Sequence, residues 1–291
     1  MKKTLLFLTV SLVSVGCKKK DPDTIVAYSR ENNSGTYMYF KERVLDNKDF
    51  ASGVQTLPGT AAVINAVSKD SSAIGYGGIG YVKGVKTLKV KKDAASPAVE
   101  PTLENVVNKS YPISRYLYFY TVGEPEGIVR EFIAWALGDP GQKICEEVGY
   151  YPLPQGERIV PGGGAGAGDK KTITVKGSDT MVILGQRWAE HYMKDRPGVT
   201  IQITGGGSGT GIAALINGAT DICQASREMK KAERKQLLEK FGKDAVEIRV
   251  AMDGLAIFVH ETNPLTEISL EQLRAIYTGK MKSWKELAAI K

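Results

Sequence analysis

Residues 172–225 read TITVKGSDTMVILGQRWAEHYMKDRPGVTIQITGGGSGTGIAALINGATDICQA, and their pattern sets the class of fold that we expect. Short β-prone runs, Thr172–Lys176 and Val199–Thr204, alternate with helical patterns over Met181–Met193 and Gly211–Asn217. Strands that alternate with helices of this length indicate mainly parallel sheets flanked by helices. The sequence therefore predicts an α/β fold.

The same alternation extends over the rest of the chain. A strand is expected within Asp23–Ser29, a helix over Ser34–Leu45 and a strongly β-prone strand over Arg115–Val122. The 291 residues are enough for two domains of this kind. Further helices are expected over 61–67, 128–137, 142–148, 231–241 and 269–278, and further strands over 72–81, 87–90, 221–224, 247–252 and 255–260.

A glycine-rich run divides the two regions. Residues 162–168 read GGGAGAG and follow Pro161. A run without apolar side chains cannot pack a core and is typical of a flexible linker. We therefore expect a linker here, with the α/β pattern restarting after it.

Composition narrows the classes of function. Hydrophobic residues make up 42% and charged residues 24%, which excludes an intrinsically disordered chain. No internal apolar run reaches about eighteen residues, which excludes a polytopic membrane protein. The net charge of +7 comes without a basic stripe interleaved with aromatic residues, so no nucleic-acid partner is expected. Three cysteines without metal-ligand spacing exclude a zinc ribbon, and no metal or other cofactor is expected.

The first residues have the pattern of an export signal. Two lysines precede an apolar segment, Thr4–Val15, which is too short to span a membrane as a mature helix. The following Gly-Cys pair resembles a bacterial lipobox, in which Cys17 is lipidated, although Ser14 stands where leucine is usual. A plain secretory signal is the alternative. The protein is thus expected to be exported and lipid-anchored outside the cytoplasmic membrane, or periplasmic; whether Cys145 and Cys223 pair there stays open.

Three strand-to-helix junctions share one composition. Unpaired N–H groups and the helix dipole make a helix start attractive to anions, glycine permits close approach, and Ser and Thr add hydroxyl donors. Three such starts aimed at one point would bind a small oxyanion. Ordinary N-caps are the alternative for each junction alone. The candidate residues are Ser34, Gly35 and Thr36 in the first, Ser178, Asp179 and Thr180 in the second, and Ser208, Gly209 and Thr210 in the third.

Arg30 adds a charge beside the first junction. It stands four residues before Ser34, at the end of the expected strand, and an arginine fork suits a tetrahedral oxyanion.

The sequence does not match the enzyme motifs that its glycine-rich runs suggest. The run 205–211 lacks the lysine of a phosphate-binding P-loop, and Thr210 replaces the final glycine of a GxSxG nucleophile elbow.

These residues resemble the phosphate-binding proteins of bacterial ABC phosphate uptake, which are type II periplasmic binding proteins. The resemblance covers nearly the whole chain after the signal segment. The arginine-then-SGT block and the GSGTGI block are specific together. The similar blocks are KGSDTM, GGGSGTGIAALINGATDICQASRE, AIYTGKMKSWKEL, YSRENNSGTYMYF, AIGYGGIGY and GYYPLP.

The order of these blocks departs from the family. In the family KGSDTM opens the mature protein, SWKEL runs into YSRENNSGT, and GYYPLP closes the chain. Here YSRENNSGT comes first, GYYPLP precedes the glycine run, and SWKELAAIK ends the chain. This order indicates a circular permutation in which the glycine run joins the old termini. An engineered rearrangement is favoured, and a natural one is the alternative.

The resemblance implies two α/β lobes with phosphate in the cleft between them. The resemblance implies that residues 1–20 are a signal segment and basic spacer. Residues 21–85 and 254–291 would form one lobe, and residues 86–253 would form the other. The family's ligand contacts map onto Thr180, Met181, Ser208 and Ser226, and onto Arg30 with Ser34, Gly35 and Thr36.

One position departs from the family's ligand set. Many members have Asp after the serine equivalent to Ser226, where it accepts the proton of hydrogen phosphate, but this chain has Arg227. Either Asp179 accepts this proton, or the protein discriminates against sulfate in a different way. Arg227 is itself a candidate contact of the anion.

The function predicted is high-affinity binding of inorganic phosphate, without catalysis, for delivery to an ABC permease in the membrane. The chain is expected to be a monomer. The first alternative is the same fold binding sulfate or molybdate, and the second is a phosphatase or other hydrolase.

Overall fold

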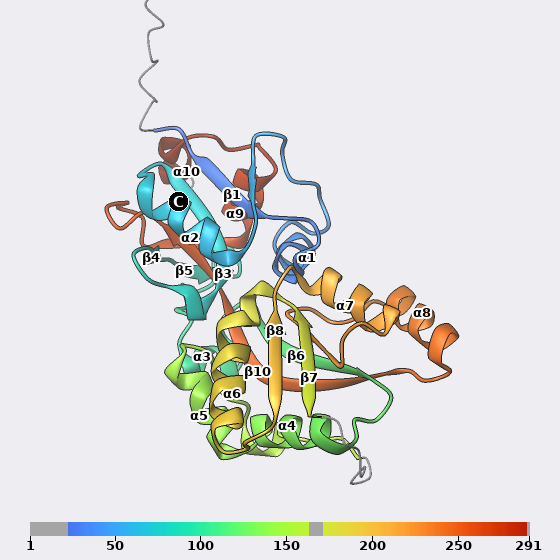
Figure 1. Ribbon diagram of the computed structural model, residues 1–291. Helices are drawn as coiled ribbons and strands as arrows, with labels where there is room; N and C mark the ends of the chain where they lie inside the picture. The colour runs from blue at the N-terminus through green and yellow to red at the C-terminus, as the bar shows by residue number, and fades with distance from the viewer. Residues whose placement is uncertain (1–22, 163–170, 290–291) are drawn as a thin grey trace, which may run out of the picture.

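The computed structural model describes residues 23–162 and 171–289, which form two α/β lobes (Figure 1). The expected signal segment with Cys17 lies outside the described residues, as does the glycine run after Gly162. Within the described part, hydrogen-bonded strands connect both lobes in the order β2-β1-β3-β10-β6-β9-β7-β8.

The first lobe contains the N-terminal strands. β1 (Val26–Arg30) lies between β2 (Gln55–Leu57) and β3 (Ala73–Gly78), and all three are parallel. The end of β10 (Ala245–Val259) adds antiparallel to β3. The helices of this lobe are α1 (Gly35–Arg43), α2 (Thr60–Lys69), α9 (Leu270–Tyr277) and α10 (Trp284–Ala289), with the short 3₁₀ turn η1 (Ile79–Tyr81).

The second lobe repeats this arrangement. β7 (Thr172–Gly177) lies between β8 (Thr200–Thr204) and β9 (Ile222–Ala225), again all parallel. β6 (Ser114–Val122) adds antiparallel to β9, and the first part of β10 pairs with β6. Its helices are α4 (Gly127–Leu137), α5 (Asp139–Glu147), α6 (Val182–Lys194), α7 (Ser208–Asn217) and α8 (Lys231–Phe241), with the 3₁₀ turns η2 (Gln155–Glu157) and η3 (Asp179–Met181).

Helices cover both faces of each sheet because the strands are apolar on both sides. In the first lobe, Ala256 and Phe258 of β10 pack with α2, and Ile257 belongs to the opposite cluster with α9. In the second lobe, α4, α5 and α6 share one core, while Ile212 of α7 and Leu237 of α8 lie in another. β1, β7 and β8 lead into α1, η3 and α7, whose starts meet between the lobes.

The long strand β10 passes from one lobe to the other. Residues 245–254 pair with β6 and residues 255–259 pair with β3, so Asp253 and Gly254 stand at the crossing. The sequence predicts two strands, 247–252 and 255–260, separated by the Asp-Gly pair. That separation is wrong, because β10 pairs with β6 up to Gly254 and with β3 from Leu255, so one strand continues through the Asp-Gly pair.

The boundary between the lobes also differs from the one expected at residue 85. β4 (Lys86–Thr87) pairs with the end of β10, and β5 (Lys89–Lys91) pairs with β11 (Glu267–Ser269). These pairings join residues 86–91 to the first lobe. After α3 (Leu103–Val107), the chain enters the second lobe at β6. The β-ladder decides the boundary here, because two-residue strands leave little pattern in a sequence.

The first and last described segments lie side by side. The Trp284 N–H donates to the Asp23 carbonyl over 2.9 Å, and the Ile25 N–H donates to the Lys282 carbonyl over 2.8 Å. The ends of the described chain are therefore close enough for a short peptide connection.

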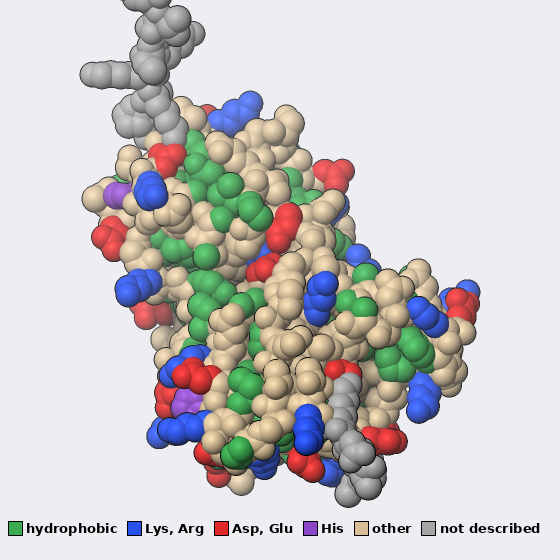
Figure 2. Space-filling model, viewed as in Figure 1, with side chains coloured by type: hydrophobic (Ala, Val, Ile, Leu, Met, Phe, Trp, Pro, Cys, Tyr) green, Lys and Arg blue, Asp and Glu red, His purple; other side chains and the backbone are tan. Residues whose placement is uncertain are grey.

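Three further properties bear on what the sequence predicts. Cys145 in α5 and Cys223 in β9 are buried and unpaired. Among the described residues, no helix combines the length and hydropathy needed to cross a membrane. On the face seen in Figure 2, Lys and Arg side chains are scattered among acidic ones over both lobes.

Candidate functional site

Hydroxyl groups from three helix starts and one strand end meet between the lobes. The Thr36 Oγ1 atom of α1 lies 2.8 Å from the Thr180 Oγ1 atom of η3. The Ser178 hydroxyl donates to Ser226 Oγ over 2.9 Å, and Ser208 Oγ lies 3.4 Å from the same atom. All five side chains are buried. The structure thus brings together residues that the sequence places up to 190 positions apart.

Glycines permit this close approach. A Cβ atom on Gly35 would lie 2.3 Å from Ser208 Oγ and 2.7 Å from Ser226 Oγ, so only glycine fits there in this arrangement. Gly207 turns the chain into α7 with a φ of 89°, in the left-handed region that glycine favours. The start of α7 thereby lies against the start of α1, where the Gly209 amide donates to the Asn33 carbonyl over 2.9 Å.

The N-cap alternative holds for only one of the three junctions. The Ser34 hydroxyl accepts from the Thr36 and Tyr37 amides, as an ordinary cap does. Neither Ser178 nor Ser208 caps its helix through its side chain. The Ser178 hydroxyl turns to Ser226, and Ser208 Oγ accepts from the Ser226 amide over 3.1 Å. These two hydroxyls are placed for something other than helix capping.

Arg30 is the cationic group beside this cluster, and it is fully buried. Its Nη1 donates to Thr60 Oγ1 over 2.7 Å, and its Nε and Nη2 donate to both oxygens of Glu31. Nη2 also donates to Asp179 Oδ2 over 2.9 Å. Burial opposes ionisation of Glu31, but the hydrogen bonds and charge of Arg30 hold the pKa of Glu31 below its ordinary value. Two carboxylates thus fix the arginine fork in place.

A second buried arginine, Arg115, links the crossing strands to the hydroxyl cluster. Its Nε and Nη2 donate to Asp253 Oδ2 over 2.8 and 2.6 Å, and its Nη2 also reaches Thr36 Oγ1 over 3.1 Å. Its Nη1 donates to the Ser226 carbonyl over 3.1 Å. Burial raises the pKa of Asp253, and the charge of Arg115 opposes that rise. Arg115 therefore contacts both lobes at the crossing.

Three further candidates point elsewhere in this structure. Arg227 forms a bidentate ion pair with Glu233, at 2.9 and 2.7 Å. The Gly209 amide donates to the Asn33 carbonyl, and Thr210 Oγ1 accepts from the Asn33 side chain over 3.2 Å. Met181 is buried beside the cluster in η3. The Arg227 fork and the Gly209 and Thr210 groups thus already have protein partners.

Several contributors were missed by reasoning from the sequence. They are Glu31, Thr60, Asn33, Arg115, Asp253 and Tyr150, whose hydroxyl donates to the Thr180 carbonyl. The available signal was a charge inside an otherwise apolar and aromatic strand, since Arg115 opens RYLYFYTV. A charged residue at such a position is rarely buried without a partner.

The chemical groups gathered here suit an anion better than a metal ion. Its groups are hydroxyls, backbone amides and two buried guanidinium groups. Within residues 23–162 and 171–289, no three His, Cys, Asp or Glu side chains gather as a metal ion would require. Hydroxyls and amides of this kind match the oxygens of a tetrahedral oxyanion.

Two α/β lobes that enclose such donors define a bilobal solute-binding protein of the periplasmic type. The family described as PBP superfamily domain matches residues 21–140 and 163–290. The phosphate-binding protein PstS 2 of Streptococcus agalactiae is 31% identical over 276 residues, covering 91% of this chain and 88% of the relative. The chain belongs to this family of PstS phosphate-binding proteins, within the PBP superfamily.

Two further comparisons agree with this membership. PstS 2 of Streptococcus pneumoniae is 27% identical over 285 residues, which cover 94% of this chain and 91% of the relative. The crystal structure of a phosphate-binding protein of a phosphate ABC transporter from the same species has a TM-score of 0.65 and 26% identity. That likeness covers 91% of this chain and 99% of the solved one.

Proposed function

We propose that this protein binds inorganic phosphate between its lobes and delivers it to the permease of an ABC importer. The observation that carries the proposal is the buried donor set that both lobes contribute beside Arg30. Thr36 comes from the first lobe, and Thr180, Ser208 and Ser226 come from the second. Relatives at about 30% identity carry the name of phosphate-binding proteins.

The energetics of the site suit tight binding. An anion that leaves water must find a donor for each oxygen, because an unpaired buried charge is costly. Hydrogen bonds to a charged group contribute about 1.5–3 kcal/mol each. A handful of them, less the cost of closing the lobes, reaches about −8 kcal/mol, which corresponds to micromolar affinity. Since both lobes would hold the anion, binding favours the closed arrangement, and closure is the signal that the permease reads.

Selectivity depends on a proton acceptor. Hydrogen phosphate carries a proton that sulfate lacks, so an acceptor in the site favours phosphate. Arg227 cannot accept this proton, because a guanidinium group has only donors, and its Nη1 and Nη2 atoms donate to Glu233. We assign the acceptor role to Asp179, whose Oδ2 contacts Arg30 and whose Oδ1 takes the Gly206 amide over 2.8 Å. Carboxylate oxygens retain further lone pairs for this purpose. Asp179→Asn should therefore narrow the gap between phosphate and sulfate affinity.

The proposal includes no turnover. The donors are hydroxyls that bond to one another, and Arg30 and Arg115 are each held by a carboxylate. In such a site the carboxylates hold the two arginines, which suits a bound ion better than the activation of a nucleophile. A hydrolase would release product from a chromogenic phosphate ester. We expect none within the sensitivity of a phosphatase assay.

We further propose that the protein is exported, lipidated at Cys17 and monomeric at the outer face of the membrane. The basis is the N-terminal sequence pattern, with Lys18–Lys20 at the lipid headgroups. Mass spectrometry of the N-terminal peptide distinguishes a diacylglyceryl-modified Cys17 from a plain signal cleavage. Cys17→Ser should move the protein from the membrane fraction to the soluble fraction.

We also propose that the chain is a circular permutant relative to the family's block order given above, and that it shares its own order with the streptococcal relatives, which align with it over 88–94% of each chain. Two observations support this. The family match falls into two segments that are separated at residues 141–162, and Asp23 and Trp284 hydrogen bond at the two ends of the described chain. Joining the last residues to Asp23 and opening the chain after Gly162 should restore the family order. The rearranged protein should fold and bind phosphate with unchanged affinity; failure to fold would contradict the permutation.

Equilibrium dialysis with labelled phosphate tests the proposed function. We expect saturable binding of one phosphate per chain, displaced by unlabelled phosphate and arsenate and much less effectively by sulfate. Displacement by sulfate or molybdate in preference to phosphate would assign the same site to another oxyanion.

A further inference from the structure

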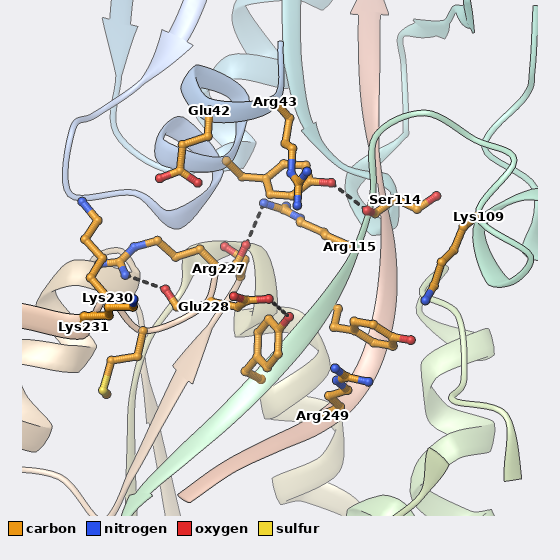
Figure 3. Close-up of a pocket in the computed structure, with 15 residues that line it drawn as sticks. Glu42, Arg43, Lys109, Ser114, Arg115, Arg227, Glu228, Lys230, Lys231 and Arg249 are labelled. Atoms are coloured by element: carbon orange, nitrogen blue, oxygen red, sulfur yellow. Dashed lines mark hydrogen bonds between the residues drawn. The ribbon is translucent and has the colours of Figure 1, made fainter. Parts of the chain in front are cut away.

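A cavity lies beside the hydroxyl cluster and has a different character (Figure 3). It has a volume of about 500 Å³ and opens between α1 of the first lobe and the 226–231 segment and β6 of the second. Arg115 and Ser226 form part of its wall, and both also contact the hydroxyl cluster. The two sites are thus neighbours that share a wall.

The lining of this cavity is strongly basic. Seven of its lining residues are Lys or Arg, and two, Glu42 and Glu228, are acidic. Arg115 and Arg227 are matched by Asp253 and Glu233. The other five cations have no carboxylate within 4 Å among the described residues. They are Arg43, Lys109, Lys230, Lys231 and Arg249.

Two of these cations are held in position by an aromatic ring. The Arg249 guanidinium lies 4.2 Å from the centre of the Tyr116 ring, and the Lys109 ammonium lies 5.3 Å from it. Cation–π contacts of this kind orient a cation without neutralising its charge. Figure 3 shows Lys109 and Arg249 on the side of the cavity opposite Lys230 and Lys231. The positive charges therefore surround the cavity instead of lying on one wall.

One buried donor in the wall also lacks a partner. Arg227 is 7% exposed, and its Nε finds no hydrogen-bond acceptor within the described chain, although its two terminal nitrogens bond to Glu233. An unsatisfied buried donor costs free energy and is usually matched by a ligand or water when the site is filled. Its position in the cavity wall fits an anionic ligand.

We propose that this cavity binds a compound carrying two or more phosphoryl groups, separately from the inner phosphate site. Its volume lies in the range of small-molecule sites, about 300–1,000 Å³, and exceeds what a single phosphate fills. The five unmatched cations are exposed to solvent, and together they favour a polyanion, because a cleft lined by one sign of charge concentrates ions of the opposite sign. Condensed inorganic phosphates and organic diphosphates share this chemistry.

Calorimetric titration with pyrophosphate at low ionic strength tests the proposal, with saturating phosphate present to fill the inner site. We expect one pyrophosphate per chain. Lys109→Gln combined with Arg249→Gln should weaken it by about tenfold or more, because two oriented charges are lost. Phosphate affinity and the melting temperature should stay unchanged in this double variant. Lys194→Gln, which removes an exposed charge on α6 outside the cavity, is the matched control.

Three results would overturn the proposal. They are displacement of pyrophosphate by phosphate, full binding by the double variant, and an equal loss in Lys194→Gln. A parallel titration with a nucleoside diphosphate distinguishes an organic from an inorganic ligand. If the protein does not bind phosphate at all, the same titration without phosphate still tests the cavity. Failure of the proposed function is thus distinguishable from failure of this inference.

Discussion

The hydroxyl oxygen of Thr36 lies 2.8 Å from that of Thr180, a residue of the other lobe 144 positions along the chain. Arg115 Nη2 donates to the same Thr36 oxygen over 3.1 Å while its guanidinium binds Asp253. The start of α1 is therefore linked to the start of α6 and to the strands that cross between the lobes. An anion bound here would contact the same groups that hold the lobes together.

Gly35→Ala tests how close the lobes must approach. The added Cβ would lie 2.3 Å from Ser208 Oγ, so this closed arrangement cannot form without displacement. Overpacking of this kind costs about 1–3 kcal/mol, which corresponds to a roughly ten- to hundredfold loss of phosphate affinity. Stability without phosphate should change little, since alanine suits a helix start and the lobes can separate.

Gly53→Ala is the matched control for that prediction. A Cβ on Gly53 would meet nothing within 4 Å, so phosphate affinity should be unchanged. Calorimetry on both variants checks the comparison. Equal affinity in the two would show that the closed contact at Gly35 is not part of binding.

The Arg115–Asp253 pair should be needed for folding and for the site. Asp253→Asn leaves a buried guanidinium without its counter-charge, which typically costs about 3–5 kcal/mol of stability. Arg115→Met with Asp253→Leu removes both charges and should recover much of that loss. Phosphate affinity should remain low in the double variant, because Thr36 loses its donor. Denaturant unfolding and phosphate titration separate the two effects, and wild-type phosphate affinity in the double variant would contradict the assigned contact.

The free energy of unfolding should fall at acid pH because Glu233 becomes protonated. Burial opposes ionisation of this half-buried side chain, but the hydrogen bonds and charge of Arg227 hold the pKa of Glu233 below its ordinary value of 4.5. A lowered carboxyl pKa gives stability that is present above pH 4.5 and is lost as pH falls through the value in the folded state. Glu233→Gln should therefore be less stable at pH 7 and lose less stability between neutral and acid pH. Unfolding curves at several pH values check this, and an unchanged slope would contradict the ion pair.

The sequence predicted the helix starts that form the site, but it did not predict the hydrogen bonds and ion pairs that connect them. The three helix starts were visible because glycine, serine and threonine follow β-prone runs, and the structure brings these starts together. The partners of Arg30 were not visible, since Asp179 lies 149 positions away and its pairing depends on how two lobes meet. Arg115 was predicted only as the first residue of a strand, because its partners Thr36 and Asp253 lie far from it in the sequence.

The parts of the fold that the sequence did not predict also depend on contacts between distant residues. Asp253-Gly254 has the composition of a turn, yet β10 runs through it because strands from both lobes pair on either side. The sequence predicts one strand over 87–90 where the structure has β4 and β5, and only long-range pairing shows that these strands join β10 and β11. Long-range pairing overrides local propensity in both cases.

Calorimetric titration of Arg30→Ala with phosphate tests the central claim most directly. The wild-type chain should bind one phosphate with micromolar or tighter affinity. The variant should bind roughly a hundredfold more weakly, because charge-assisted hydrogen bonds from the buried fork are lost. Arg187→Ala, which removes an exposed arginine paired with Glu190, should bind like the wild type. Phosphate binding by a folded Arg30→Ala protein within about threefold of the wild type would contradict the account.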